Sequence, residues 1–322
     1  MVQQGTPRSR LWSCACVGII TAGLLVGSEP TLQFALARTG TADADIAELW
    51  VRPEPTRDLF WGVGGKRLAP DPAARYTVID IKRGGFSRGF TVLDPAKREW
   101  STKFPPEAPT EVAASRIFWG VGFHQPPVYY LAEWTAEKAP SPNPQLPARF
   151  RERDPDLFGL EAGEPWSYYK NPFTDSRQLK GMLALHAMLG NSDLKDTQNA
   201  IYTLEKPHEG ARTWYVARDL GQTFGRTGLL DPPRGDVEAF EQSGFIKGIE
   251  NGVVRFDYRG RHKSLFEGIR PADVRWMCER LAALSEDQLQ DAFRAAGYPR
   301  HTADRFIRRL RQKIAEGLQL KD

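Results

Sequence analysis

Cysteine is scarce in this chain, with three residues among 322, and two of them, Cys14 and Cys16, lie in an apolar N-terminal stretch. The rest of the chain holds only Cys278, and a single cysteine cannot form an internal disulfide. The fold beyond the N-terminal stretch must therefore be held by its hydrophobic core. Cys278 lies in an apolar helical pattern, so we expect it to be a small core residue.

Common hydrolase and metal-binding motifs are absent from the sequence. Neither a Gly-x-Ser-x-Gly elbow nor a His-Glu-x-x-His pair occurs. The five histidines show no spacing typical of metal ligands, and we expect structural or surface roles for His124, His186, His208, His262 and His301. The net charge is only +4, which does not indicate a nucleic-acid partner.

Long apolar runs are also missing, apart from Leu11 to Gly27, which follows Arg8 and Arg10. This run is shorter than the roughly 20 apolar residues that span a bilayer. Ala35-Leu36-Ala37 then supplies small residues at the spacing that signal peptidase prefers. We expect residues 1–37 to be a cleaved signal peptide, with an uncleaved anchor as the alternative. The protein would be periplasmic or secreted and would meet the membrane only transiently.

The first half of the remaining chain predicts a small antiparallel sheet with one helix. Residues 38–57 contain few large apolar side chains and are expected to form a tether, and residues 58–131 are expected to form the sheet-rich lobe. Runs of β-branched and aromatic residues predict four strands, and an apolar face predicts one helix. The strands are Tyr76–Ile81, Phe90–Leu93, Trp100–Phe104 and Val128–Leu131, and the helix is Thr110–Val121.

The second half, residues 132–322, predicts a mainly helical lobe. Ala139–Pro147 holds four prolines and cannot continue a helix or a central strand. An apolar helix at Leu179–Leu189 leads into a polar loop, and two short strands and a helical region follow. The strands are Ala200–Leu204 and Trp214–Ala217, and the helical region begins at Pro271. These patterns together predict an α+β, two-lobed fold.

The loop between the first two predicted strands is rich in glycine, with Gly84, Gly85 and Gly89. Glycines let a backbone approach phosphate groups closely, although glycines in a hairpin tip are more often only turn residues. On the third predicted strand, Lys103 could neutralise phosphates while Glu111 holds it through an ion pair. Glu107 is a competing partner because it lies nearer to Lys103 in the sequence.

The polar loop after the apolar helix, Asn191 to Asn199, carries the groups that phosphoryl transfer needs. Asp193 could orient an attacking hydroxyl, Lys195 could supply a cation and Asn199 an oxygen ligand for a metal. The alternative is an ordinary turn, because these residue types favour turns. Downstream, Asp219 follows an apolar strand and could hold Mg²⁺ between phosphates, while Gly221 lets the chain turn away.

The segment from Tyr76 to Gly221 resembles atypical members of the protein-kinase-like superfamily. The secretory-pathway kinases of the Golgi casein-kinase type are similar, with HipA-type and phosphoinositide kinases as distant relatives, and so are signal-bearing bacterial proteins with the same loop. The most specific stretch is Thr110–Ile117 followed by Gly122–Pro127, which is similar to the glutamate-bearing helix and double-proline turn of the secretory kinases.

The resemblance implies a two-lobed kinase-like fold that uses ATP with Mg²⁺ or Mn²⁺. It implies that Lys103 and Glu111 form the phosphate-binding pair and that adenine lies near Leu131 to Trp134. It further implies that Asp193 is the catalytic base, Lys195 a phosphate-facing lysine and Asp219 a metal ligand.

The loop departs from the kinase pattern in two places. The usual metal-binding asparagine lies five residues after the catalytic aspartate, and that position is Gln198, so Gln198, Asp196 and Asn199 are all candidates. Asn191-Ser192 also replaces the usual His-Arg.

Three functions stay open at this point. They are an exported kinase with a protein or glycan hydroxyl as acceptor, a nucleotide-binding pseudokinase, and a structural envelope protein. Transfer of AMP instead of phosphate is a variant of the first.

Overall fold

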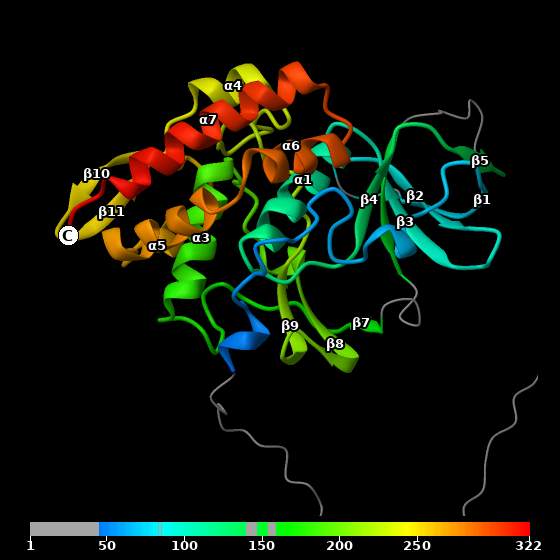
Figure 1. Cartoon of the computed structure of the whole chain (residues 1–322), viewed down its shortest axis with the longest axis horizontal. Helices are drawn as coiled ribbons and strands as arrows, with labels where there is room; N and C mark the ends of the chain where they lie inside the picture. The colour runs from blue at the N-terminus through cyan, green and yellow to red at the C-terminus, as the bar shows by residue number, and fades with distance from the viewer. Residues whose placement is uncertain (1–44, 83, 85, 140–146, 154–158) are drawn as a thin grey trace, which may run out of the picture. The chain divides into compact units, whose positions relative to one another are not determined.

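The computed structural model describes residues 45–82, 84, 86–139, 147–153 and 159–322 (Figure 1). The predicted signal peptide, residues 1–37, lies outside this range. Gly85 and most of the predicted proline-rich turn lie outside it as well. The described residues belong to one unit, Thr41–Asp322.

A six-stranded sheet forms the first part of the fold, in the order β4-β6-β3-β2-β1-β5. All neighbouring pairs are antiparallel except β1 with β5, which is parallel. Aromatic side chains from alternate strand positions, including Trp100 and Phe150, pack into one buried cluster. The strands are β1 (Arg75–Lys82), β2 (Gly89–Leu93), β3 (Glu99–Lys103), β4 (Val128–Leu131), β5 (Thr135–Glu137) and β6 (Ala148–Glu152).

The predicted lobe boundary after residue 131 is wrong, because the sheet continues to Glu152. Strand β6 pairs with both β3 and β4, so it lies inside the sheet although it follows the proline-rich segment in sequence. The chain therefore leaves the sheet after β6.

The predicted tether over residues 38–57 is also wrong for its described part. A short 3₁₀ helix, η1 (Ile46–Glu48), begins the described chain, and Leu49 is fully buried. Trp50 forms an isolated bridge with Phe123 and donates its indole N–H to the Val121 carbonyl at 2.7 Å. This segment is part of the packed fold.

Helix α1 (Glu107–Gly120) follows β3 and connects the sheet to the helical part. It contacts β4 and β6 on one side and α6 on the other, which is why nearly all its side chains are buried. The helix predicted at Thr110–Val121 is thus present, starting three residues earlier. Its central position allows side chains on α1 to reach both parts of the fold.

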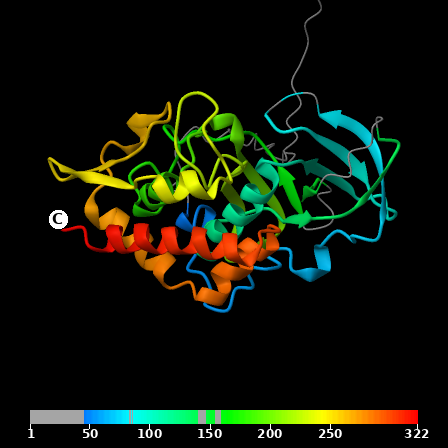
Figure 2. The same ribbon diagram turned by 90° about the horizontal axis from the view of Figure 1, so that it is seen from above.

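The remaining chain is mainly helical, as the sequence predicts (Figures 1 and 2). Helix α7 runs along this part and packs against α4, α5 and α6, while α3 packs against α5 (Figure 2). The helices are α3 (Arg177–Leu189), α4 (Val237–Gln242), α5 (Pro271–Ala282), α6 (Glu286–Ala295) and α7 (Arg300–Leu318).

Two small sheets and three further short helices complete the described fold. The predicted strand pair after the polar loop is present and longer than expected. The strands are β7 (Leu160–Ala162), β8 (Asn199–His208), β9 (Ala211–Ala217), β10 (Ile246–Glu250) and β11 (Val253–Phe256), and the 3₁₀ helices are η2 (Lys66–Leu68), η3 (Asp196–Gln198) and η4 (Lys263–Phe266).

Cys278 is fully buried on α5, as expected for a core residue. Burial raises the pKa of its thiol to about 12, so it is not a reactive thiolate. A Cβ atom at Gly317 of α7 would lie 2.3 Å from the Cys278 sulfur, so this glycine permits the close approach of the two helices. Among the described residues, no helix combines the length and the apolar content that crossing a bilayer requires.

Candidate active site

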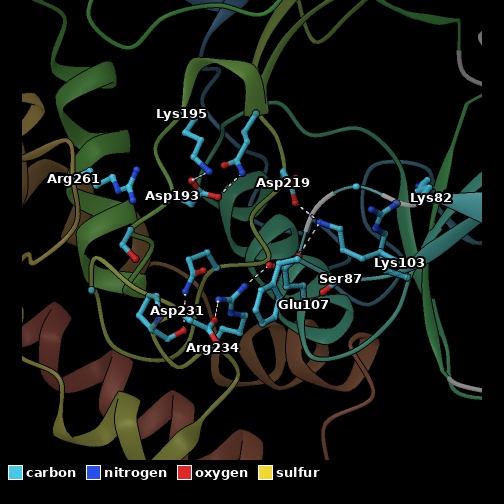
Figure 3. A pocket seen from close by; sticks show the side chains of 18 of the residues that line it. Lys82, Ser87, Lys103, Glu107, Asp193, Lys195, Asp219, Asp231, Arg234 and Arg261 are labelled. Carbon is cyan, nitrogen blue, oxygen red and sulfur yellow. Dashed lines mark hydrogen bonds and ion pairs between the residues drawn. The ribbon is translucent and has the colours of Figure 1, made fainter.

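A cavity of about 520 Å³ brings together five of the predicted site residues from both parts of the fold, Gly84, Lys103, Asp193, Lys195 and Asp219 (Figure 3). Its walls come from the β1–β2 loop, strands β3 and β6, the loop after α3 and the segment after β9. Basic side chains outnumber acidic ones. The basic residues are Lys82, Lys103, Arg149, Arg151, Lys195, Arg234 and Arg261, and the acidic residues are Glu107, Asp193, Asp219 and Asp231.

Lys103, the last residue of β3, lies among three carboxylates. Its ammonium bonds Asp219, and it lies 2.8 Å from Glu111 and 3.4 Å from Glu107 (Figure 3). Burial alone would lower the pKa of Lys103, but Glu111 and Asp219 outweigh it and raise the pKa above its ordinary value. Lys103 therefore stays protonated. The predicted Lys103–Glu111 ion pair is present, and Glu107 is the more distant partner.

Glu111 is buried behind the cavity wall and forms ion pairs with several basic side chains. Its carboxylate lies 3.0 Å from Arg149 and 3.5 Å from Arg151, in addition to Lys103. Burial alone would raise the pKa of Glu111, but Arg149 and Lys103 hold it well below its ordinary range. Glu111 is thus a permanent negative charge that fixes the positions of the basic groups.

Asp219 follows β9 in a left-handed backbone conformation, with φ of 63°. Short polar residues such as aspartate tolerate this region better than most. A Cβ at Gly221 would lie 2.7 Å from the Glu107 side chain, so glycine lets this segment pass close to α1. Thr110 on α1 also donates its hydroxyl to the Gly221 carbonyl at 2.7 Å. Helix α1 thereby fixes the segment that carries Asp219.

Asp193 lies across the cavity, on the loop after α3. One carboxylate oxygen lies 2.9 Å from Lys195, and the other accepts a hydrogen bond of 2.5 Å from the Gln198 amide. Asn191 accepts a hydrogen bond from the Asp193 backbone N–H at 3.0 Å. Figure 3 shows Asp193 and Lys195 together on the side of the helical part, opposite Lys103.

A series of hydrogen bonds between buried polar side chains supports the loop that carries Asp193. The Asn191 amide lies 3.0 Å from His186 Nδ1, and His186 Nε2 lies 2.9 Å from the Tyr168 hydroxyl. Burial lowers the pKa of His186 to about 3, so the imidazole is neutral. His186 is structural, as expected, and it supports the loop that bears Asp193.

Asn199, predicted as a metal ligand, does not line the cavity. It begins β8, is buried, and donates its amide to the Trp166 carbonyl at 2.9 Å. Gln198, one residue earlier, lines the cavity instead. Asp196 is exposed and is not part of the lining. The position five residues after Asp193 is therefore the one that faces the cavity, and Asn199 does not face it.

The residues on this side of the cavity fit a hard divalent cation. The Gln198 Oε1 atom is buried and has no hydrogen-bond partner among the described residues, so an oxygen ligand is available there. Asp193 and Asp219 face the same cavity. The described part of the chain holds no cluster of three His, Cys, Asp or Glu side chains suited to a metal. The Asp219 carboxylate with the Gln198 amide oxygen matches the way Mg²⁺ binds through one or two carboxylates together with phosphate oxygens.

The three predicted phosphate-binding glycines differ in their positions. Gly84 lines the cavity, and Gly85 lies outside the described residues. Gly89 begins β2, where an added Cβ would lie 2.1 Å from the Thr102 carbonyl oxygen, so it serves the close packing of β2 and β3 and not the cavity. Ser87 was missed. It lines the cavity, and its buried hydroxyl has no partner among the described residues.

The region predicted to hold adenine, Leu131 to Trp134, is absent from the lining of this cavity. Trp134 packs inside the sheet core against Phe150, with ring centroids 5.1 Å apart. The prediction assumed that the chain crosses to the helical part after residue 131. It instead continues into β5 and β6, and this places Leu131 and Trp134 on the sheet.

Lys82, Arg149 and Arg151 line the cavity and were not predicted from the sequence. Arg149 and Arg151 are two residues apart on β6, so their side chains share one face of the strand. That alternation was the available signal, but the pairing of β6 beside β3 cannot be seen in the local sequence. Burial, followed by the charges of Arg149 and Arg151, lowers the pKa of Lys82 to about 7.

Arg234 connects the mouth of the cavity to α1. Its guanidinium lies 2.5 Å from Glu107 and 2.6 Å from Asp231, and 3.6 Å from the centroid of the Phe86 ring. Phe86 belongs to the β1–β2 loop, so this contact holds that loop against the segment after β9. The loop thereby covers one side of the cavity.

Comparison with solved structures finds kinases. A Helicobacter pylori proinflammatory kinase, CtkA, matches with a TM-score of 0.36 and 11% identity, over 78% of this chain and 100% of that one. The Golgi casein kinase matches with a TM-score of 0.38 and 14% identity, over 78% of this chain and 74% of that one. The same kinase with Mn/ADP bound matches with a TM-score of 0.37 at equal identity and coverage. No protein-family model and no curated protein sequence matches the chain.

The α+β fold class is confirmed, with a sheet-rich part followed by a mainly helical part.

Proposed function

We propose that this protein is a metal-dependent phosphotransferase that moves a phosphate group from ATP to a hydroxyl of a protein or glycan outside the cytoplasm. The observation that supports this most is the position of Lys103. Its ammonium is held between Glu111 and Asp219 at the wall of a cavity that Asp193 faces from the other side. A fixed cation opposite a carboxylate is the arrangement that phosphoryl transfer needs.

Each group has a defined task in this proposal. Lys103 binds phosphate oxygens, and Glu111 keeps it in place. Asp193 accepts the proton of the acceptor hydroxyl. The hydroxyl oxygen bonds to the γ-phosphorus, the bond from that phosphorus to the β–γ bridging oxygen breaks, and ADP leaves. Lys195, 2.9 Å from Asp193, offsets charge on the transferred group. Asp219 and Gln198 would hold the Mg²⁺ or Mn²⁺, which would neutralise phosphate charge when bound.

The direct test is to incubate the full chain with γ-labelled or α-labelled ATP, Mg²⁺ or Mn²⁺, and mixed protein and glycan acceptors. We expect the γ-label in the acceptor fraction and a loss of at least about a hundredfold in the Asp193→Ala variant. Asp196→Ala is the matched control, because Asp196 is in the same loop but outside the cavity. It should retain activity. Transfer of the α-label would instead indicate AMP transfer.

A nucleotide-binding pseudokinase is the second candidate, and one observation favours it. Position 198 holds glutamine in place of the usual asparagine, and the described residues hold no cluster of three His, Cys, Asp or Glu side chains suited to a metal. Nucleotide-dependent thermal stabilisation without transfer of either label would support this candidate. If neither metal allows ATP to stabilise the full chain, both candidates fail.

The extracytoplasmic location is a proposal from the N-terminal segment alone. The basic residues, the uncharged run and Ala35-Leu36-Ala37 support it. Fractionation of cells that express the full chain, with mass spectrometry of the N-terminus, tests it. A periplasmic or secreted form beginning at Arg38 is expected. A membrane-bound form that keeps residues 1–37 would indicate an anchor.

A further inference from the structure

The strand residues that line the cavity are all polar, and most of them are basic. They are Lys82 on β1, Thr102 and Lys103 on β3, and Arg149 and Arg151 on β6, which we call the sheet wall. Purine bases are bound mainly by apolar and aromatic surfaces, and the sheet wall offers none among the described residues. A ligand portion that lies against this wall must therefore be anionic.

The charges on this wall do not balance within the protein. Glu111 is shared by Lys103, Arg149 and Arg151, and Lys103 also pairs with Asp219 and Glu107. Lys82, whose pKa burial lowers to about 7, forms no ion pair with a carboxylate of the described residues. Taking an unpaired charge out of water costs several kcal/mol. An excess of buried cations is stabilised when a polyanion binds beside it, so this wall is suited to a phosphate chain.

The hydrogen-bonding state of the wall shows which groups are available. Arg149 is used by the protein, since it bonds the Ser101 carbonyl at 2.8 Å and pairs with Glu111. Arg151 is less engaged. Within the described chain its guanidinium has one ion pair, to Glu111 at 3.5 Å, which leaves most of its N–H donors for a ligand.

Lys82 is the second available group on the wall. Its ammonium bonds Ser101 and donates to the Thr102 carbonyl at 3.0 Å, which fixes it at the cavity edge. An ammonium has three donors, so one remains for a ligand.

We propose that Lys82, Arg149 and Arg151 form a phosphate subsite on the sheet wall, so that the cavity recognises the phosphate chain of its ligand and binds inorganic tripolyphosphate without a base. This inference rests on the proposed function only in taking a phosphate donor as the ligand. Gln198 and Asp219 would hold the metal, and neither belongs to the subsite, so the subsite works without a metal.

Isothermal titration calorimetry on the full chain tests the subsite with three probes: tripolyphosphate, ATP and adenosine, each in EDTA. We expect tripolyphosphate and ATP to bind with Kd values within about tenfold of each other, and adenosine not to bind. Arg151→Met and Lys82→Met should each weaken tripolyphosphate binding about tenfold or more, because each removes a charge-assisted hydrogen bond. Arg149 is left unchanged because it also holds Glu111.

Matched controls come from the same sheet. Arg75→Met on β1 and Lys97→Met in the β2–β3 turn remove exposed cations outside the cavity and should leave the Kd unchanged. Circular dichroism and thermal unfolding verify that each variant is folded. Where a variant is unfolded, competition of tripolyphosphate with ATP on the unaltered chain decides instead, and competition is expected.

The outcomes separate this inference from the proposed function. Binding of ATP without binding of tripolyphosphate, or wild-type affinity in both Met variants, overturns the subsite and leaves the proposed function standing. Binding of tripolyphosphate but not of ATP supports the subsite and overturns the nucleotide function. Binding of adenosine alone overturns the subsite, because the wall would then recognise a base.

Discussion

Glu111 is the side chain on which the arrangement of charges in the cavity depends. It is 2% exposed and faces Lys103, Arg149 and Arg151. Removing one charge from a buried ionic cluster leaves the opposite charges without a partner. The loss in the free energy of unfolding is then larger than the stabilisation that the intact ion pairs provide. A single substitution at Glu111 should therefore affect stability as well as binding.

We expect Glu111→Gln to lower the free energy of unfolding by about 3 kcal/mol, because the isosteric amide removes the charge and leaves three buried cations. Urea denaturation at pH 7 measures this. Glu99→Gln is the control, since Glu99 is 37% exposed and pairs with Arg153 at the surface. It should change stability by less than about 0.5 kcal/mol. Equal effects in the two variants would show that the buried cluster is not special.

The lowered pKa of Lys82 leads to a prediction about how tripolyphosphate binding depends on pH. Burial lowers its pKa to about 7, with Arg149, Arg151 and Lys103 lowering it and Glu111 opposing. A bound phosphate chain raises that pKa, so the ligand binds together with a proton once the pH exceeds about 7. Tripolyphosphate affinity should fall between pH 7.5 and 9, by up to tenfold per pH unit. Lys82→Arg keeps the charge at these pH values, so it should flatten the dependence. An unchanged slope in that variant would contradict the assignment to Lys82.

At the scale of elements, the loop after α3 positions the proposed base. Asn191 holds the Asp193 backbone and is itself held by His186, which hydrogen-bonds Tyr168. None of these three side chains lines the cavity, so they act through Asp193. The loop is thus built on a buried polar network that makes its geometry rigid.

We expect Asn191→Ala to lower kcat about tenfold while the KM for ATP changes by less than about twofold, because the base is misplaced but the phosphate-binding groups are not. Steady-state kinetics with varied ATP separates the two constants. Asn171→Ala removes a similar turn-stabilising side chain, whose carbonyl oxygen accepts from the Phe173 N–H outside the cavity, and should leave kcat unchanged. A rise in KM with constant kcat would show that Asn191 supports binding instead.

The sequence reveals the site residues that lie on locally recognisable helices and strands. It misses the site residues whose positions depend on which strands pair in the sheet. Lys103 and Glu111 are found because a strand and the following helix are both visible in the hydrophobic pattern. Arg149 and Arg151 are missed because β6 pairs with β3 residues that lie 46 to 52 positions earlier, and no local pattern fixes that register.

The position of Asn199 outside the cavity has a local cause. Gln198 ends η3 and Asn199 begins β8, so consecutive side chains point to opposite sides and a shift of one residue exchanges cavity for core. The sequence therefore indicates that an amide residue lies near the proposed metal site, but only the start of β8 determines whether Gln198 or Asn199 faces the cavity.

In the molecule as a whole, a buried lysine on helix α7 connects this helix to other segments of the helical part. Lys313 is fully buried, and its amine donates to the Met188 carbonyl at 2.9 Å and to the Ser243 hydroxyl at 2.8 Å. It thereby joins α7 to the end of α3 and to the segment after α4. No carboxylate forms an ion pair with Lys313 among the described residues, and burial lowers its pKa to about 7, with a further lowering by Arg309.

This lysine predicts how the stability of the fold depends on pH. In the unfolded chain Lys313 titrates near its ordinary pKa of about 10.4, so between pH 7 and 9 the unfolded state binds more protons than the folded state. The free energy of unfolding should therefore rise with pH over this window, by up to about 1.4 kcal/mol per pH unit from this group. Urea denaturation at pH 7, 8 and 9 measures the slope, with Lys82 contributing in the same direction. Lys313→Met should reduce the slope, and Lys321→Met, at the exposed C-terminus, should not. If the slope in Lys313→Met equals that of the unaltered chain, Lys313 is charged in the folded protein and an anion must lie beside it.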